Sequence, residues 1–141
     1  MKKQTTIIRT AMVATMLVIS CFPILAQDTV DKATCSASIS EVERVFWDMA
    51  DYIGGKYPDR TRTSLYSKLT GAKTKLSQDK YYDAQLKLEQ FGEKIMDLTE
   101  AKGKKDPKLA YEHAAKVMPS TNEAICCVKQ LRDSTYQCAV P

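Results

Sequence analysis

The chain is poor in the residues on which most enzyme chemistry depends. His113 is its single histidine, and the chain has no Gly-x-Ser-x-Gly turn for a serine nucleophile. The sequence therefore predicts no catalytic residues and no bound cofactor. A small hydrolytic enzyme is the second alternative function, and it would require acidic residues of the first and third predicted helices to meet His113 in a cleft.

Patterns typical of β-structure are also lacking. After residue 26 the chain has no alternating, β-branched runs bounded by turns, so no strand is expected. Apolar residues instead recur at steps of three and four, which is the period of amphipathic helices. The sequence predicts an all-α fold: a small antiparallel bundle of four main helices plus a short fifth, tied by two disulfides.

The chain has no apolar run of the about 20 residues that a membrane-spanning helix needs. Its longest apolar stretch, residues 11–22, follows Lys2, Lys3 and Arg9, and this order is typical of a signal peptide. We expect the signal peptide to cover residues 1–26. The sequence therefore predicts an exported bacterial protein, either periplasmic or secreted.

Excess charge of one sign is small once the signal peptide is removed. The full chain holds 21 Lys and Arg against 17 Asp and Glu, and three of these cations lie before residue 27, which leaves a net charge of +1. Nucleic-acid-binding proteins usually carry a basic surplus on one face. The sequence therefore predicts no nucleic-acid partner.

Cysteines are few, but four of the five fall after residue 26, at Cys35, Cys126, Cys127 and Cys138. An even number in an exported chain indicates two disulfides, and because adjacent cysteines suit zinc poorly, no metal site is predicted. A bridge between the adjacent pair would be strained, so we expect Cys35 to bond one of them and Cys138 the other. The fifth, Cys21, lies in a lipobox-like sequence, so a lipid anchor there is the competing interpretation of the N-terminus.

Three segments are expected after the signal peptide. Residues 27–37 are an extended N-terminal lead-in, residues 38–132 are the helical bundle domain, and residues 133–141 are a C-terminal tail held by Cys138. Ser38 and Glu41 have capping-box spacing, which predicts that the first helix begins there, and a proline at position 119 predicts the end of the fourth. The expected helices cover residues 38–53, 61–76, 81–101, 106–118 and 120–131.

The clearest helical period lies between residues 63 and 98 and predicts a helical hairpin with a tight reversal at residues 77–80. Each arm has one apolar stripe, and the two stripes are expected to face each other or a common partner. The first stripe consists of Leu65, Leu69, Ala72 and Leu76, and the second of Tyr81, Ala84, Leu88, Phe91, Ile95 and Leu98.

Most of these residues, followed by Gly103, Lys104 and Lys105, resemble the FIMAH-type small helical modules of secreted bacterial proteins. The resemblance covers residues 64–118. It implies an all-helical, non-catalytic accessory or interaction domain of an exported bacterial protein, with no catalytic residues to transfer. The chain departs from that pattern by its additional first helix and by its four cysteines.

Cations gather on the first arm of the hairpin. Complementarity with acidic neighbouring helices or simple solvation explains such a cluster, and a contact surface for another protein or an anionic glycan is the functional interpretation. The candidate surface consists of Arg60, Arg62, Tyr66, Lys68, Lys73, Lys75 and Tyr82, joined by Lys102, Lys104 and Lys105. We predict an exported, non-catalytic binding or structural module of the bacterial envelope or extracellular space. The alternative is a small inhibitor or immunity-type protein that acts through this basic face.

Overall fold

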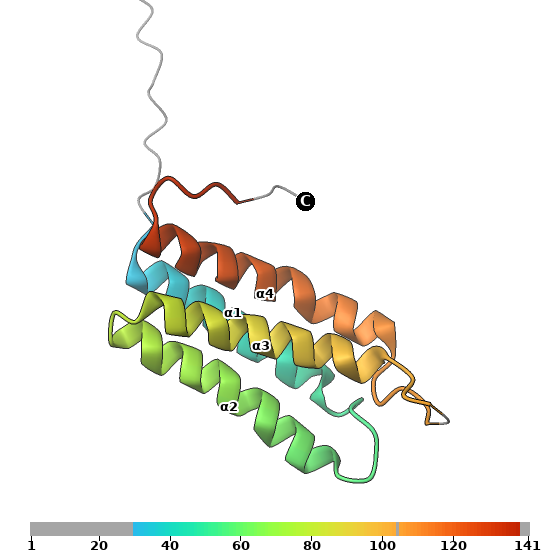
Figure 1. Ribbon diagram of the computed structural model, residues 1–141. Helices are drawn as coiled ribbons and strands as arrows, with labels where there is room; N and C mark the ends of the chain where they lie inside the picture. The colour runs from blue at the N-terminus through green and yellow to red at the C-terminus, as the bar shows by residue number, and fades with distance from the viewer. Residues whose placement is uncertain (1–29, 104, 139–141) are drawn as a thin grey trace, which may run out of the picture.

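The computed structural model describes residues 30–103 and 105–138, so the predicted signal peptide and Cys21 lie outside the described residues. Within these ranges the chain is all-helical, as predicted, and it contains no strand. The helices are α1 (Lys32–Ala50), α2 (Pro58–Ser77), α3 (Tyr81–Thr99) and α4 (Tyr111–Arg132) (Figure 1). None of them is both long and apolar enough to cross a membrane.

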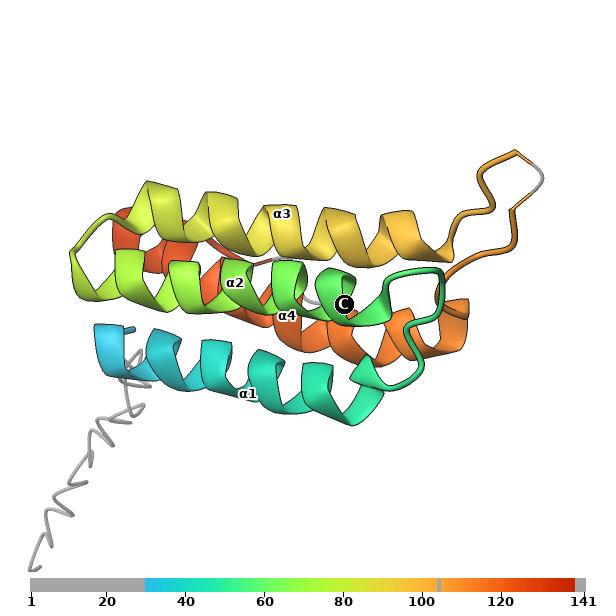
Figure 2. The same ribbon diagram turned by 90° about the horizontal axis from the view of Figure 1, so that it is seen from below.

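The four helices lie side by side, and each packs closely against two others. The close pairs are α1 with α2, α2 with α3, α3 with α4, and α4 with α1. Figure 2 shows the connections 51–57 and 100–110 at one end of the bundle, which we call the loop end. The connection 78–80, the start of α1 and the end of α4 lie at the other, which we call the terminal end.

The two stripes predicted for the hairpin form much of the core. Every member is buried except Tyr81, which is half-buried and packs against the core. Helix α1 adds Phe46, whose ring meets Phe91 of α3 edge to face with 5.7 Å between the ring centres. Gly92 permits a close approach of α3 to α4, because a Cβ atom there would lie only 3.3 Å from Met118.

The first helix begins earlier than predicted, so the extended lead-in is wrong for residues 32–37. Asp31 is the N-cap, and its side chain accepts a hydrogen bond of 2.7 Å from the backbone N–H of Thr34. The hydroxyl of Ser38 donates to the carbonyl of Thr34, as serines inside helices do. The spacing of Ser38 and Glu41 therefore falls within α1 and does not cap it.

The predicted short fifth helix is also wrong, because α4 continues through Pro119. Proline removes one helical hydrogen bond and costs about 3 kcal/mol inside a helix. The buried residues on either side of it share one unbroken period, so both halves of α4 pack on the same neighbours and offset that cost. These residues are Ala114, Val117, Thr121, Ala124 and Val128. Residues 106–110, predicted to open a fourth helix, precede α4 as an irregular segment.

The cysteines form two pairs at disulfide distance, as predicted. Cys35 of α1 pairs with Cys127 of α4, with 5.4 Å between their Cα atoms, and Cys126 pairs with Cys138, at 5.7 Å. The first pair joins residues 92 positions apart, so it closes a long loop of the unfolded chain and stabilises the fold by about 4 kcal/mol in the chain-entropy model. The second pair ties residues 133–138 to α4.

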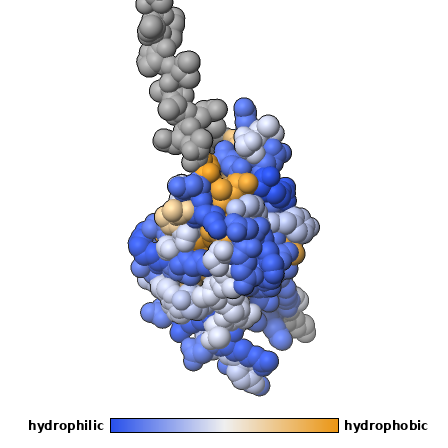
Figure 3. All heavy atoms as spheres, turned by 90° about the vertical axis from the view of Figure 1, so that its left-hand side faces the viewer, coloured by the Kyte–Doolittle hydropathy of each residue, from blue (hydrophilic) through white to orange (hydrophobic). Residues whose placement is uncertain are grey.

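Figure 3 looks onto the terminal end and shows hydrophobic side chains gathered in one patch with hydrophilic residues around it. Val30 and Leu131, which belong to the segments that meet at this end, are half-buried and pack against the core. The terminal end is thus closed by apolar packing as well as by the two cysteine pairs.

Candidate functional site

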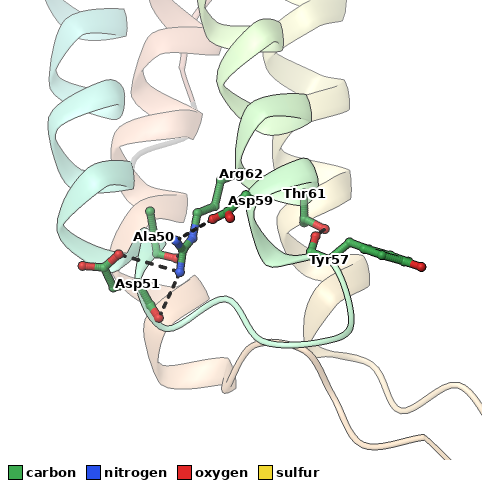
Figure 4. A network of polar contacts seen from close by, with 6 residues as sticks. All are labelled: Ala50, Asp51, Tyr57, Asp59, Thr61 and Arg62. Atoms are coloured by element: carbon green, nitrogen blue, oxygen red, sulfur yellow. Dashed lines mark hydrogen bonds and ion pairs between the residues drawn. The ribbon is translucent and has the colours of Figure 1, made fainter.

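Arg62, one of the predicted surface cations, joins the start of α2 to the end of α1. Its guanidinium donates hydrogen bonds to the backbone carbonyl of Ala50 (2.8 Å), to that of Asp51 (3.4 Å) and to the carboxylate of Asp59 (3.2 Å) (Figure 4). Carbonyls at a helix C-terminus lack partners within the helix, so a cation there satisfies them. Only 24% of the side chain is exposed, and Arg62 therefore holds two helices together.

Three more of the predicted cations are also engaged within the bundle. They reach from α2 to polar side chains of both neighbouring helices, the complementarity that was one explanation of the cluster. These contacts are Lys73 to Glu43 of α1 (2.5 Å), Lys75 to Asp83 of α3 (3.5 Å) and Lys68 to Gln90 of α3 (3.4 Å). Neighbouring helices therefore neutralise Lys73 and Lys75, while Lys68 is held by a hydrogen bond to a neutral amide.

The two predicted tyrosines do not join these cations in one surface. Tyr66 is half-buried, and its ring lies 5.2 Å from that of Trp47 on α1. Tyr82 is 60% exposed, but it lies at the start of α3, at the terminal end, where the guanidinium of Arg132 is 5.7 Å from its ring. Of the predicted set, Arg60 and Lys105 lie at the loop end without an ion pair to a described residue.

The connections of the loop end surround a depression of about 790 Å³. Its lining combines the segment 54–57, the first turns of α2, Lys94 of α3 and part of the 100–110 connection. Five Lys and Arg side chains face one carboxylate, a formal charge of +4. The lining residues are Gly54, Gly55, Lys56, Tyr57, Arg60, Thr61, Ser64, Lys94, Lys105, Asp106 and Lys108.

The cations of this depression are not neutralised by the part of the chain that the structure describes. No ion pair among these residues involves Lys56, Arg60, Lys94, Lys105 or Lys108. The ammonium of Lys56 lies over the Tyr57 ring, 5.3 Å from its centre. Unpaired cations around a concave surface concentrate positive potential there.

Backbone contacts hold the two connections of the loop end together. The N–H of Gly54 donates to the carbonyl of Lys108 (2.7 Å), and the N–H groups of Lys108 and Leu109 both donate to the carbonyl of Leu98. Leu109 is buried and anchors the second connection in the core. Gly55 has a φ of +101°, which glycine adopts without strain, and the side chain of Lys108 lies directly beside it.

Acidic residues limit the cationic region on one side. A second hollow of about 190 Å³ shares Lys94, Lys105, Asp106 and Lys108 with the depression. It adds Asp97 and Glu100 at the end of α3, and Asp97 lies 3.7 Å from Lys102. The unpaired positive charge is therefore greatest toward Lys56 and Arg60.

His113 lies on the first turn of α4 and not in the depression. Its ring stacks on Tyr52, with 3.9 Å between the ring centres, and its Nε2 lies 3.6 Å from Glu112. Within the described residues, His113 forms no ion pair with an acidic residue of α1 or α3, which the enzyme alternative would require. No group of three or more His, Cys, Asp and Glu side chains in the described ranges is placed to hold a metal ion.

The sequence analysis did not predict that Lys94 and Lys108 line the same depression as Arg60. Lys56 was missed as well, and its position directly after two glycines in a loop is the signal in the sequence that could have found it. Comparison of the chain with protein-family models, with curated proteins and with solved structures finds no match. The resemblance to FIMAH-type modules stays a prediction.

Proposed function

We propose that the protein is an exported, non-catalytic binding module of the bacterial envelope or extracellular space. In this proposal an antiparallel, disulfide-tied bundle is the scaffold, and the depression at the loop end binds an anionic partner. The carrying observation is the gathering of five unpaired cations around one concavity in a chain whose net charge without residues 1–26 is only +1. Such a concentration favours an anionic ligand and has no evident role in stability.

Export is supported by the use of cysteine. Two cysteine pairs at disulfide distance favour an oxidising compartment, in which such bonds persist. The alternative of an inhibitor or immunity-type protein acting through the α2 face has less support, because Arg62, Lys68, Lys73 and Lys75 already have partners inside the bundle.

Charge neutralisation at the loop end tests the proposal. The exported chain is titrated at low ionic strength with polygalacturonate, dextran sulfate, polyphosphate and polyaspartate, and binding is measured by calorimetry. We expect at least one of these polyanions to bind, and Lys56→Gln with Arg60→Gln and Lys108→Gln to weaken it roughly tenfold. Binding should also weaken as salt is added.

A matched triple variant controls for the loss of net charge. Lys80, Lys87 and Lys116 lie away from the depression and have no ion pair with a described residue, so their change to Gln removes the same charge elsewhere. We expect this variant to bind like the unmodified chain. Equal weakening by both triple variants, or no binding of any polyanion, would overturn the proposal.

A further inference from the structure

The lining of the depression offers no large aliphatic side chain as an anchor for a ligand. It contains no aliphatic side chain, no Met, no Phe and no Trp, and Tyr57 is its only aromatic residue. Protein partners usually bury apolar or aromatic anchors in the centre of an interface, and acyl chains need apolar walls. Large apolar anchors and acyl chains therefore lack a matching pocket here, which favours a ligand with many polar groups.

Tyr57 adds a flat surface beside these charges. It is 60% exposed, and Figure 4 shows its ring directed away from the cluster around Arg62. The face of a sugar ring carries C–H groups that pack on such an aromatic ring, while sugar hydroxyls bond to polar neighbours. The ammonium of Lys56 lies over one face of the Tyr57 ring, 5.3 Å from its centre, so a sugar would stack on the opposite face.

Hydroxyl groups complete the polar lining. The hydroxyl of Thr61 donates to the carbonyl of Tyr57 (3.2 Å), which leaves its oxygen lone pairs free to accept. The carbonyl of Ser64 accepts from Ser67, but the hydroxyl of Ser64 has no hydrogen bond to another described residue. Hydroxyls that both donate and accept suit a polyhydroxylated ligand.

The size and the charge distribution indicate more than one anionic group. A volume of about 790 Å³ is far larger than one phosphate or sulfate ion and lies in the range of sites for ligands of several rings, about 300–1,000 Å³. The five cations come from four segments of the chain: the 51–57 connection, α2, α3 and the 100–110 connection. They surround the depression and do not converge on a single point of one loop.

We infer that the depression binds an acidic oligosaccharide, in which sugar rings carry carboxylate, sulfate or phosphate groups. Tyr57 stacks on one ring, the hydroxyls of Thr61 and Ser64 bond to the sugar, and the cations pair with its anionic groups. The inference rests on the proposed function, since it names the ligand class of the same site.

Titration of the full exported chain with matched probes tests this ligand class. The probes are short oligosaccharides that bear carboxylate, sulfate or phosphate, a neutral oligosaccharide of equal length, and polyaspartate, oligophosphate and an oligodeoxynucleotide of equal charge. We expect at least one acidic oligosaccharide to bind roughly tenfold more tightly than every other class. The three acidic probes distinguish the source of the anionic group.

Variants of Tyr57 separate stacking from charge. Tyr57→Ala should weaken binding of the acidic oligosaccharide about fivefold and leave the binding of polyaspartate unchanged, whereas Tyr57→Phe should retain the affinity. Tyr82→Ala removes a tyrosine of equal exposure, 60%, at the terminal end and should change neither. Circular dichroism of each variant checks that the bundle is folded.

The outcomes distinguish this inference from the proposed function. If polyaspartate or oligophosphate binds as tightly as the acidic oligosaccharides and Tyr57→Ala has no effect, the ligand class is overturned while the anion-binding function stands. Tighter binding of the oligonucleotide overturns it in favour of nucleic acid, and equal binding of the neutral sugar overturns the need for charge. If no binding depends on Lys56, Arg60 and Lys108, both proposals fail.

Discussion

The two ends of the bundle differ in how many of their cations have partners within the fold. At the terminal end Lys32 bonds to Asp79 (2.8 Å), Lys75 to Asp83 (3.5 Å) and Arg132 to Gln85 (2.9 Å). At the loop end the cations around the depression have no ion pair with a described residue, and the acidic residues lie on one side. At the loop end Arg62 also makes internal contacts, but the five cations around the depression are left open to a ligand.

Covalent and apolar contacts follow the same division. Both cysteine pairs lie toward the terminal end, where they join the first turn of α1 and the tail to the last turns of α4. The loop end is held by backbone hydrogen bonds between its two connections and by the buried side chain of Leu109. The difference indicates that stability is concentrated at one end and ligand-accessible charge at the other.

Removal of the long-range cysteine pair has the largest expected effect on this comparison. Cys35→Ala with Cys127→Ala should lower the free energy of unfolding by about 4 kcal/mol, because the unfolded chain regains the entropy of a long loop. The control, Cys126→Ala with Cys138→Ala, opens a loop of only 12 residues and should cost less, about 3 kcal/mol at most. Urea denaturation measures both, and a larger loss in the control would contradict the assignment of stability to the first pair.

Arg60 and Arg62 test the division within one turn of α2. Arg62→Gln should lower the free energy of unfolding by about 2 kcal/mol, since it leaves the carbonyls of Ala50 and Asp51 without their charged donor. Arg60→Gln should change stability by less than about 0.5 kcal/mol but should weaken binding of a polyanion. Thermal unfolding and calorimetric titration of the two variants should give opposite patterns, and matching patterns would remove the distinction.

Substitution of Gly55 and Gly71 compares a glycine that the loop-end backbone requires with one that lies inside a helix. Gly55→Ala should cost about 1–2 kcal/mol, because φ is +101° there and an added Cβ lies 3.3 Å from the Lys108 side chain. Gly71 lies inside α2, where a Cβ would meet Lys87 at an ordinary 3.7 Å, so Gly71→Ala should stabilise by about 0.5–1 kcal/mol. An unchanged or raised urea midpoint for Gly55→Ala would show that the loop-end geometry does not depend on glycine.

The smallest expected effect is a dependence on acid at the terminal end. Hydrogen bonds from Lys32 and then from Tyr81 lower the pKa of Asp79 below its ordinary value. A lowered pKa in the folded state means that this contribution to stability is present at neutral pH and is lost as the pH falls below about 4, through the lowered pKa. The melting temperature of Asp79→Asn should therefore fall less than that of the unmodified chain between about pH 5 and pH 2.5.

Two features make this variant informative. Asp79 has a φ of +59°, and asparagine tolerates that conformation as aspartate does. The substitution therefore changes the charge without straining the backbone. Lys32→Gln is the matched variant, because it removes the stronger of the two donors to Asp79 and should reduce the acid dependence in the same way. A steeper acid loss in Asp79→Asn than in the unmodified chain would contradict the assignment.

The hairpin of α2 and α3 could be predicted because its apolar period is local. Leu65, Leu69, Phe91 and Ile95 must face one side of their helices, and that side is buried wherever the helices pack. The start of α1 and the end of the fourth helix were predicted wrongly for different reasons. A better cap stands before Ser38, and the common buried face of Val117 and Thr121 keeps α4 helical through its proline.

The candidate site could be predicted only in part, for a related reason. Arg60 and Lys105 were recognised as surface cations, but Arg62 and Lys73 looked equivalent to them in the sequence. Lys94 and Lys108 lie 34 and 48 residues further along the chain from Arg60, so no local pattern joins them to it. Their proximity depends on the packing of α2 and α3 and on the hydrogen bond between Gly54 and Lys108.

The sequence by itself determined the all-helical class, the two buried stripes and the supply of four cysteines, because periodicity and composition act on the chain locally. The tertiary structure decided which cysteines pair and which cations have partners. Ion pairing depends on distances of a few ångströms between side chains of different helices, and such distances exist only after the helices have packed. That packing neutralises Lys73 and Lys75 on α2 and leaves Lys56, Arg60 and Lys108 open around the depression.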